Sequence, residues 1–262
     1  MVKRKTRKTK MTYGEMHKIC QPAGGSQDYI TMKAGRKLSM PLTVLFIKLG
    51  ISANSVSFAR WFVGLLGVLL IACGGYPLTI AGVLIFHLAI VLDYVDGELF
   101  RWYTWETGRK STILQGSWLD KVFDNSYRPM LLLAAGCGAW RQFGNPWFLV
   151  LGGVGAVLIM FDILIKLRTS DVLIYKKGVH LLEREKASRQ TKGGSAKDMF
   201  MELWRINNPV TFYWWFAIVG YLWLFLCIFV PLLALQVGRT FWAQWRKILK
   251  YDSELLKEAR LS

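Results

Sequence analysis

Residues 78–101 read LTIAGVLIFHLAIVLDYVDGELFR, and this stretch decides the fold. The stretch contains the end of a run without Lys, Arg, Asp or Glu, which extends from Trp61 to Leu92, and continues into an acidic segment. A helix needs about 20 predominantly apolar residues to cross the hydrocarbon core of a bilayer, and this run is longer. Acidic residues at the edge of hydrocarbon are costly to bury as ions, so they mark a site or a partnered group. We therefore expect a membrane helix that ends in a functional acidic segment.

The composition of the whole chain indicates an integral membrane protein. Of its 262 residues, 53% are hydrophobic, 12 are Trp and only 19% are charged. A soluble domain of this length has more charge and shorter apolar runs. The net charge of +17 must therefore be concentrated on the segments that face water. The four Cys residues have no motif spacing, so we interpret them as packing residues rather than disulfides.

The pattern predicts an all-α integral membrane protein with six transmembrane helices, preceded by an N-terminal interfacial amphipathic helix. Residues 55–73, 78–100 and 147–165 supply three spans, and another begins near Ser117. We expect Pro41 to break or kink the amphipathic helix, and we expect residues 101–111 to form a loop.

The uncharged run from Pro209 to Val237 supplies the remaining two spans. As a single span it would leave the basic residues after it outside, against the tendency of cytoplasmic segments to carry Lys and Arg. A hairpin that turns near Gly220 returns them to the cytoplasm. Both halves of the acidic segment then lie at the cytoplasmic ends of spans two and three, and we expect a cell-membrane or endomembrane protein with its active site facing the cytoplasm.

Four regions follow along the chain. We expect a basic flexible tail over 1–27, a juxtamembrane amphipathic helix over 28–50, a six-helix domain over 51–245 with a cytoplasmic segment over 166–208, and a basic cytoplasmic tail over 246–262. The basic residues of the N-terminal tail favour anionic lipid as a partner over nucleic acid, because a membrane domain follows them.

The acidic segment contains two pairs of Asp residues with helical spacing. Asp93 and Asp96 are three residues apart, and Asp120 and Asp124 are four apart, so each pair shares a helix face. Carboxylates that converge repel one another unless cations lie between them. Oxygen ligands without Cys or His favour Mg²⁺, Mn²⁺ or Ca²⁺, and a pair of such ions commonly serves displacement at phosphorus. Alternatively, the acids face water at a helix end and balance nearby Arg and Lys.

This segment resembles the signature of the CDP-alcohol phosphotransferase (CDP-alcohol phosphatidyltransferase) family, class I. The family pattern is D-x-x-D-G-x-x-A-R, about eight residues, then G-x-x-x-D-x-x-x-D. Phe100 replaces the usual Ala, and the spacer from Trp102 to Gln115 is longer than in the family. The remaining fixed positions all match: Asp93, Asp96, Gly97, Arg101, Gly116, Asp120 and Asp124.

The resemblance implies a role for each matched residue. Asp93, Asp96, Asp120 and Asp124 would hold one or two Mg²⁺ or Mn²⁺ ions, and Asp124 is also the candidate base for the acceptor hydroxyl. Gly97, Arg101 and Gly116 would line the nucleotide pocket. Asn54 lies in a segment similar to the family's P-N-x-x-[TS] entry to the first span, so it is a candidate nucleotide contact. The alternative for Asn54 is an ordinary helix N-cap. The family also suggests a homodimer.

Three basic residues are candidates for binding the acceptor. Arg128 lies one turn beyond Asp124 within an apolar helix, where an unpaired Arg is expensive. With Lys166 and Arg168 it could grip a phosphate on the acceptor. In the alternative, Arg128 pairs structurally with Asp162, while Lys166 and Arg168 extend to the membrane interface.

The function that the resemblance implies is transfer of a substituted phosphate group in phospholipid biosynthesis. The donor would be a CDP-linked lipid such as CDP-diacylglycerol, and the acceptor an alcohol such as inositol phosphate or glycerol phosphate, with release of CMP. Transfer from CDP-choline or CDP-ethanolamine to diacylglycerol is an alternative, as is transfer between soluble CDP-inositol and inositol phosphate. A cation transporter is the alternative outside the enzymes, although it would place charges nearer the bilayer midplane.

Overall fold

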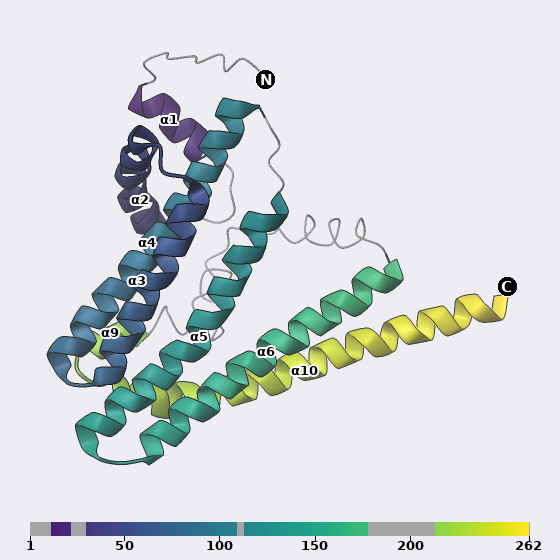
Figure 1. The fold of residues 1–262 in the computed structure, drawn as a ribbon. Coiled ribbons are helices and arrows are strands. Elements are labelled where there is room, and N and C mark those ends of the chain that lie inside the picture. The colour runs from purple at the N-terminus through teal and green to yellow at the C-terminus, as the bar shows by residue number, and fades with distance from the viewer. Residues whose placement is uncertain (1–11, 22–29, 109–112, 178–212, 262) are drawn as a thin grey trace. The chain divides into compact units, whose positions relative to one another are not determined.

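The computed structural model of the chain describes residues 12–21, 30–108, 113–177 and 213–261. Figure 1 shows these residues as a succession of helices, and none of them lies in a strand. The all-α expectation is therefore confirmed for the described part of the chain. The helices are α1 (Tyr13–Cys20), α2 (Ile30–Leu49), α3 (Ala53–Cys73), α4 (Tyr76–Thr107), α5 (Ile113–Phe143), α6 (Trp147–Lys177), α9 (Tyr213–Ile218) and α10 (Leu222–Leu261).

Four of these helices are long and apolar enough to cross a membrane. They are α3, α4, the Trp147–Asp171 part of α6 and the Leu222–Leu249 part of α10. Each has the length of about 20 residues that the hydrocarbon core demands. Helix length and composition thus support an α-helical membrane protein. Six spans exceed the four found among the described residues, so the six-span topology stays a prediction.

Several predicted boundaries are wrong because the helices continue farther than the apolar runs. Residues 101–107, predicted as loop, form the last two turns of α4, which ends only before Gly108 with its φ of +64°. Helix α5 begins at Ile113, ahead of Ser117, and α6 continues past residue 165 to Lys177. Charged side chains extend a helix into water readily, because Lys, Arg and Glu have high helix propensity. Pro41 also does not break α2, which continues through it.

Glycines with positive φ values form the turns between helices. Gly74 and Gly75 have φ of +74° and +82° between α3 and α4, and Gly144 has φ of +68° between α5 and α6. Gly220, with φ of +82°, separates α9 from α10. A side chain with a Cβ rarely adopts such φ values, so glycine fixes these chain turns. The interruption predicted near Gly220 is confirmed, although residues 209–212 lie outside the described residues.

The chain divides into two compact units. The N-terminal unit comprises residues 1–62 and 88–119, and the C-terminal unit comprises residues 63–87 and 120–262. The division falls within α3, α4 and α5, so each of these helices contributes to both units.

The N-terminal unit has a small apolar core formed by α1, α2 and the end of α4. Cys20, Met40 and Trp102 are its buried members, and Val44 and Tyr103 are among the side chains that pack against them. The Tyr103 hydroxyl also donates a hydrogen bond of 2.9 Å to the carbonyl of Ile51. These contacts explain why residues 101–107 stay helical instead of forming the predicted loop. Helix α2 covers the predicted juxtamembrane segment, and its interfacial position stays a prediction.

The C-terminal unit is held together by glycines at which helix backbones meet. A Cβ added to Gly67 of α3 would lie 2.8 Å from the carbonyl oxygen of Gly82 in α4. A Cβ added to Gly136 of α5 would lie 2.9 Å from the Cα of Gly152 in α6. Such approaches exclude any side chain. Small residues at helix contacts are typical of membrane helices, where close packing must supply much of the attraction.

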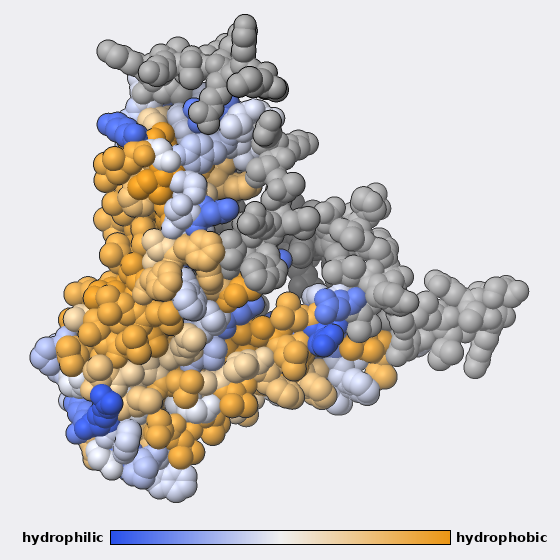
Figure 2. Space-filling model, in the orientation of Figure 1, coloured by the Kyte–Doolittle hydropathy of each residue, from blue (hydrophilic) through white to orange (hydrophobic). Residues whose placement is uncertain are grey.

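Helices α6 and α10 of the C-terminal unit pack along each other, as Figure 1 shows. The opposite face of α6 is apolar and exposed, with a stripe at Val150, Val154, Val157, Phe161 and Leu164. Figure 2 shows orange, apolar residues over much of the visible described surface. An exposed apolar stripe of this length is compatible with hydrocarbon and unfavourable in water.

Candidate active site

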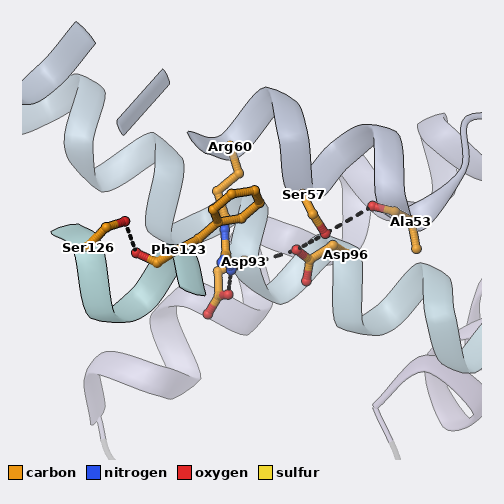
Figure 3. Close-up of polar contacts among 7 residues, drawn as sticks. All are labelled: Ala53, Ser57, Arg60, Asp93, Asp96, Phe123 and Ser126. Atoms are coloured by element: carbon orange, nitrogen blue, oxygen red, sulfur yellow. Dashed lines mark hydrogen bonds and ion pairs between the residues drawn. The ribbon is translucent and has the colours of Figure 1, made fainter. Parts of the chain in front are cut away.

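The two Asp residues of the first half of the motif lie one turn apart on α4 and meet Arg60 of α3 (Figure 3). The guanidinium group of Arg60 forms an ion pair with the Asp93 carboxylate through Nη1. The same nitrogen lies 3.7 Å from Oδ2 of Asp96. Arg60 is only 1% exposed and Asp96 is also buried. The acids therefore do not simply face water at a helix end, and this alternative is wrong for Asp96.

Ser57 orients the second carboxylate. Its hydroxyl donates a hydrogen bond of 2.7 Å to Oδ2 of Asp96 and also lies 3.2 Å from the carbonyl oxygen of Ala53 (Figure 3). Ser57 and Arg60 are three residues apart, so they share one face of α3. This face presents a hydroxyl and a guanidinium to the two acids, and it fixes the orientation of Asp96 before any ligand binds.

The donor atoms of this cluster suit a cation. Two carboxylates meet one guanidinium here, and the Ser57 hydroxyl holds one carboxylate oxygen of Asp96 in place. Carboxylate oxygens without Cys or His are the donors that Mg²⁺ and Mn²⁺ prefer. Asp93 and Asp96 thus fit the metal that the family resemblance implies, with Arg60 as a resident counter-cation beside it.

The second half of the predicted metal site lies on α5. Gly116, Asp120 and Asp124 belong to this one continuous helix, as their four-residue spacing predicted. Asp124 is half-buried, while the side chain of Asp120 lies outside the described part of the chain. Among the described residues, no three His, Cys, Asp or Glu gather to hold a metal ion. The convergence of all four Asp residues stays a prediction, since α4 and α5 bring them from different units.

Gly97 and Arg101 lie on α4 beside each other. Among the described residues, a Cβ added to Gly97 would meet the Arg101 guanidinium alone, at 3.5 Å. The positively charged Arg101 side chain therefore lies next to Gly97. Nε of Arg101 donates a hydrogen bond of 2.5 Å to the carbonyl of Cys20, at the end of α1. Arg101 is thereby tied to the N-terminal helix. Its role toward a nucleotide stays a prediction.

Asn54 does not cap α3, so the N-cap alternative is wrong. The helix begins at Ala53, and the residue before it, Ser52, accepts a hydrogen bond of 3.2 Å from the backbone N–H of Ser55. Ser52 therefore satisfies the first turn, as an N-cap residue does. Asn54 is exposed in that turn. Its predicted nucleotide contact stays untested.

The predicted acceptor residues differ in their contacts. Lys166 of α6 donates to Oδ2 of Asp162 one turn earlier, so Asp162 pairs with Lys166. Pairing of Asp162 with Arg128, the structural alternative, is wrong. Arg128 is half-buried in α5 and forms no hydrogen bond or ion pair with the described residues. Arg168 is exposed. An Arg without a counter-ion in an apolar helix is costly and is usually retained for a ligand.

Sequence reasoning overlooked three residues that shape this site. Arg60, Ser57 as a partner of Asp96, and Glu98 were not assigned roles, yet Arg60 and Glu98 are each 1% exposed. One signal was available: Arg60 directly precedes the uncharged run, and a charge at that position requires a partner. Which acid is its partner depends on how α3 packs on α4.

The chain matches no protein-family model and no curated protein sequence with which it was compared. The resemblance to the CDP-alcohol phosphotransferases therefore rests on the motif residues themselves.

Proposed function

We propose that this chain is an integral membrane CDP-alcohol phosphotransferase. The observation that carries the proposal is the cluster of Asp93, Asp96, Ser57 and Arg60. The cluster includes two residues of the second half of α4, a helix long enough to cross a membrane, where the family-like segment begins. An acid pair with one buried and oriented member, Asp96, and one partly exposed member, Asp93, suits a cation that binds phosphate.

The proposed topology has six spans with the site facing the cytoplasm. Helices α3, α4, α6 and α10 supply four spans. Helix α5 is long enough for a fifth, at about 46 Å for 31 residues. The sixth would be the segment before Gly220, of which α9 is the described part. The distribution of Lys and Arg over the connecting segments supports this orientation.

The proposed reaction is an in-line displacement at the phosphorus that carries the donor's alcohol group. The acceptor oxygen bonds to this phosphorus, the bond to CMP breaks, and the acceptor proton passes to Asp124 or to water. A divalent cation, when bound, offsets the charge of the diphosphate and of the departing CMP. Asp93 and Asp96 would bind the cation, Ser57 orients Asp96, and Gly97 leaves room for the donor.

The basic side chains favour an acceptor that carries phosphate. Arg128 has no partner among the described residues, and its planar guanidinium suits a phosphate group. Diacylglycerol carries no phosphate for Arg128 to bind. The proposal therefore favours a CDP-lipid donor and an acceptor such as glycerol phosphate or inositol phosphate.

The test is release of CMP by the purified full chain. The chain in detergent or nanodiscs is incubated with CDP-diacylglycerol and a panel of alcohols that includes glycerol phosphate, inositol phosphate, inositol and serine, with Mg²⁺, with Mn²⁺ and with chelator. We expect cation-dependent CMP release with a phosphorylated acceptor, together with one new lipid. CDP-choline with diacylglycerol and CDP-inositol with inositol phosphate serve as competing substrate pairs.

Two results would contradict the proposal. If no substrate pair releases CMP above the rate of an Asp96→Ala variant, the chain is not this kind of enzyme. If the chain instead carries Mn²⁺ across a sealed vesicle membrane without hydrolysing or transferring any CDP substrate, the transporter alternative is supported.

A further inference from the structure

A second acidic side chain of α4, Glu98, is more deeply buried than either Asp of the candidate site. It is 1% exposed. Both of its carboxylate oxygens accept hydrogen bonds: Oε1 from Gln21 Nε2 and the Ser39 hydroxyl, each at 2.6 Å, and Oε2 from the Thr43 hydroxyl at 2.6 Å. A carboxylate has only acceptors to offer, and here only donors face it. The neighbouring helices are therefore matched to an acid at this position.

The donors all come from the N-terminal arm, which we define as α1, Gln21 and α2. Gln21 follows the last residue of α1, while Ser39 and Thr43 are one turn apart on α2. The Gln21 amide also donates at 2.9 Å to the carbonyl of Arg36 in α2. Glu98 thus joins the end of α1, the middle of α2 and α4 at one buried point.

Further contacts attach the same arm to the next turn of α4. Arg101 Nε binds the Cys20 carbonyl at 2.5 Å, and Trp102 packs against Cys20 and Met40. Burial and, to a lesser extent, the Glu98 carboxylate raise the pKa of the Cys20 thiol to about 11, while Arg101 opposes the rise. The Cys20 thiol is therefore both shielded and protonated while the arm is docked.

Glu98 and the acid pair face different partners around the same helix. Glu98 is two positions after Asp96, which is a rotation of about 200° about the helix axis. Ser57 and Arg60 of α3 hold the side of α4 that carries Asp93 and Asp96. The N-terminal arm holds the side that carries Glu98. Contacts on opposite sides prevent the end of α4 from rotating or tilting.

We propose that Glu98 is a positioning residue, whose buried carboxylate docks the N-terminal arm on α4 and thereby holds Asp93 and Asp96 in the orientation that binds a divalent cation. This inference rests on the proposed function for the purpose of the cation. The docking itself depends only on the contacts of Glu98. Nothing in the family-like pattern assigns a role to this position, which is one of its variable residues.

The first experiment measures docking through the Cys20 thiol. Cys73→Ser, Cys137→Ala and Cys227→Ser leave Cys20 as the only thiol of the full chain. Maleimide labelling of Cys20 at neutral pH is then timed in this background and in two variants of it. We expect Glu98→Ala, and separately Ser39→Ala with Thr43→Val, to label at least about tenfold faster because local opening exposes the thiol. If neither labels faster, docking through Glu98 is overturned.

The second experiment asks whether the arm acts on the acid pair. Mn²⁺ binding is measured by the loss of the free-ion electron paramagnetic resonance signal, without any substrate. The Ser39→Ala/Thr43→Val variant is decisive, because it alters α2 alone and leaves every residue of α4 in place. We expect its Kd for Mn²⁺ to rise at least about threefold through this indirect coupling. Thr107→Val makes the same chemical change on α4, where the hydroxyl binds its own helix's Tyr103 carbonyl, and should leave the Kd unchanged.

The outcomes separate this inference from the proposed function. Faster labelling of Cys20 with an unchanged Kd for Mn²⁺ would overturn the positioning role and leave Glu98 as a packing residue. Both proposals are supported if the Ser39→Ala/Thr43→Val variant has a raised Kd for Mn²⁺ and saturating Mn²⁺ restores its CMP release. If the wild-type chain binds Mn²⁺, the α2 variant binds it more weakly and the wild-type chain releases no CMP, the proposed function fails and the role of Glu98 stands. A wild-type chain that binds no Mn²⁺ overturns the positioning role.

Discussion

The two units of the chain are stabilised by different interactions. In the N-terminal unit, polar side chains of Gln21, α2 and α3 converge on the carboxylates of α4, with Glu98 and Asp96 as the centres. In the C-terminal unit, helix backbones meet directly at glycines such as Gly136 and Gly152. Hydrogen bonds fix direction and require particular partners, whereas glycine contacts fix distance and require only the absence of a side chain.

This difference indicates how each unit responds to substitution. Changes to the polar contacts of α4 alter orientation and charge, so we expect them to act mainly on cation binding and activity. Changes to the glycine contacts force helices apart, so we expect them to act mainly on folding. The predictions that follow test this separation, beginning with the largest expected effect.

Loss of an acid from the N-terminal unit should have the largest effect on activity. Asp96→Ala removes a carboxylate that Ser57 and Arg60 hold in place, so CMP release should fall by about a thousandfold, as when a preorganised electrostatic group is removed. The thermal midpoint should change little. Asp171→Ala, at an exposed position on α6, is the control. Retention of more than a tenth of the activity would place catalysis elsewhere.

Arg60→Gln should be the most destabilising change among these variants. Removing one partner of a buried ion pair leaves the acids without their cation, at a cost of about 3 kcal/mol. Mg²⁺ or Mn²⁺ should restore part of the thermal midpoint, because either ion can supply the missing positive charge. Thermal unfolding with and without the ions measures this, and exposed Arg239→Gln is the control. If the ions restore nothing, Asp93 and Asp96 do not form a cation site.

A pair of adjacent glycines tests the packing of the C-terminal unit. A Cβ at Gly152 would lie 2.7 Å from the Leu132 carbonyl oxygen, whereas a Cβ at Gly153 would meet open space. Gly152→Ala should therefore destabilise the chain by about 1–3 kcal/mol, while Gly153→Ala should be neutral or slightly stabilising. Thermal unfolding of the two variants decides between them. Equal thermal midpoints would mean that α5 and α6 do not meet at this glycine.

Ser57→Ala should weaken cation binding without unfolding the chain. The variant loses one hydrogen bond to the Asp96 carboxylate, worth about 1.5 kcal/mol, which corresponds to roughly a tenfold rise in the Kd for Mn²⁺. Ser126→Ala is a matched control, because its hydroxyl binds only the carbonyl of Phe123 in its own helix (Figure 3). An equal effect of both variants would indicate a general loss of helix stability.

The smallest expected effect concerns the start of α1. The Thr12 backbone N–H and hydroxyl hold the pKa of the Glu15 carboxyl below its ordinary value of 4.5. Because the folded pKa is lowered, the stabilisation of α1 is present above pH 4.5 and is lost as pH falls through the folded pKa. The hydrogen-exchange protection of α1, corrected for the pH dependence of the intrinsic exchange rate, should therefore fall in acid, and Glu15→Gln should show this lower protection at neutral pH. If acid leaves the protection of wild-type α1 unchanged, the capping contact contributes nothing.

The sequence predicted the parts of the fold that depend on local composition. The apolar runs located α3, α4, α6 and α10, and the sequence also indicated the break between helices near Gly220. Helix ends were less predictable. Residues 101–107 contain the polar side chains of a loop, and they are helical because Trp102 and Tyr103 pack against α1 and α2. The hydropathy of a segment does not reveal such contacts between residues that are distant in the sequence.

The candidate site was predictable only in part. The spacing of Asp93 and Asp96 was sufficient to place both on one face, since helical periodicity is a local property. Their pairing with Arg60 and Ser57 required α3 and α4 to pack in one register, which no spacing within either helix reveals. Lys166 is different, because its partner Asp162 lies four residues earlier on the same helix and helical spacing alone could have paired them.

By itself, the sequence determined the helical class, the membrane-length apolar runs, the glycine turns and the acids on one face of α4. These features depend on residues within a few positions of one another. Only the tertiary structure decided that α3 supplies a serine and an arginine to those acids, and that Gln21 and α2 supply three donors to Glu98. Buried polar groups need partners, but the choice among available partners depends on three-dimensional packing, which brings together residues as distant in sequence as Gln21 and Glu98.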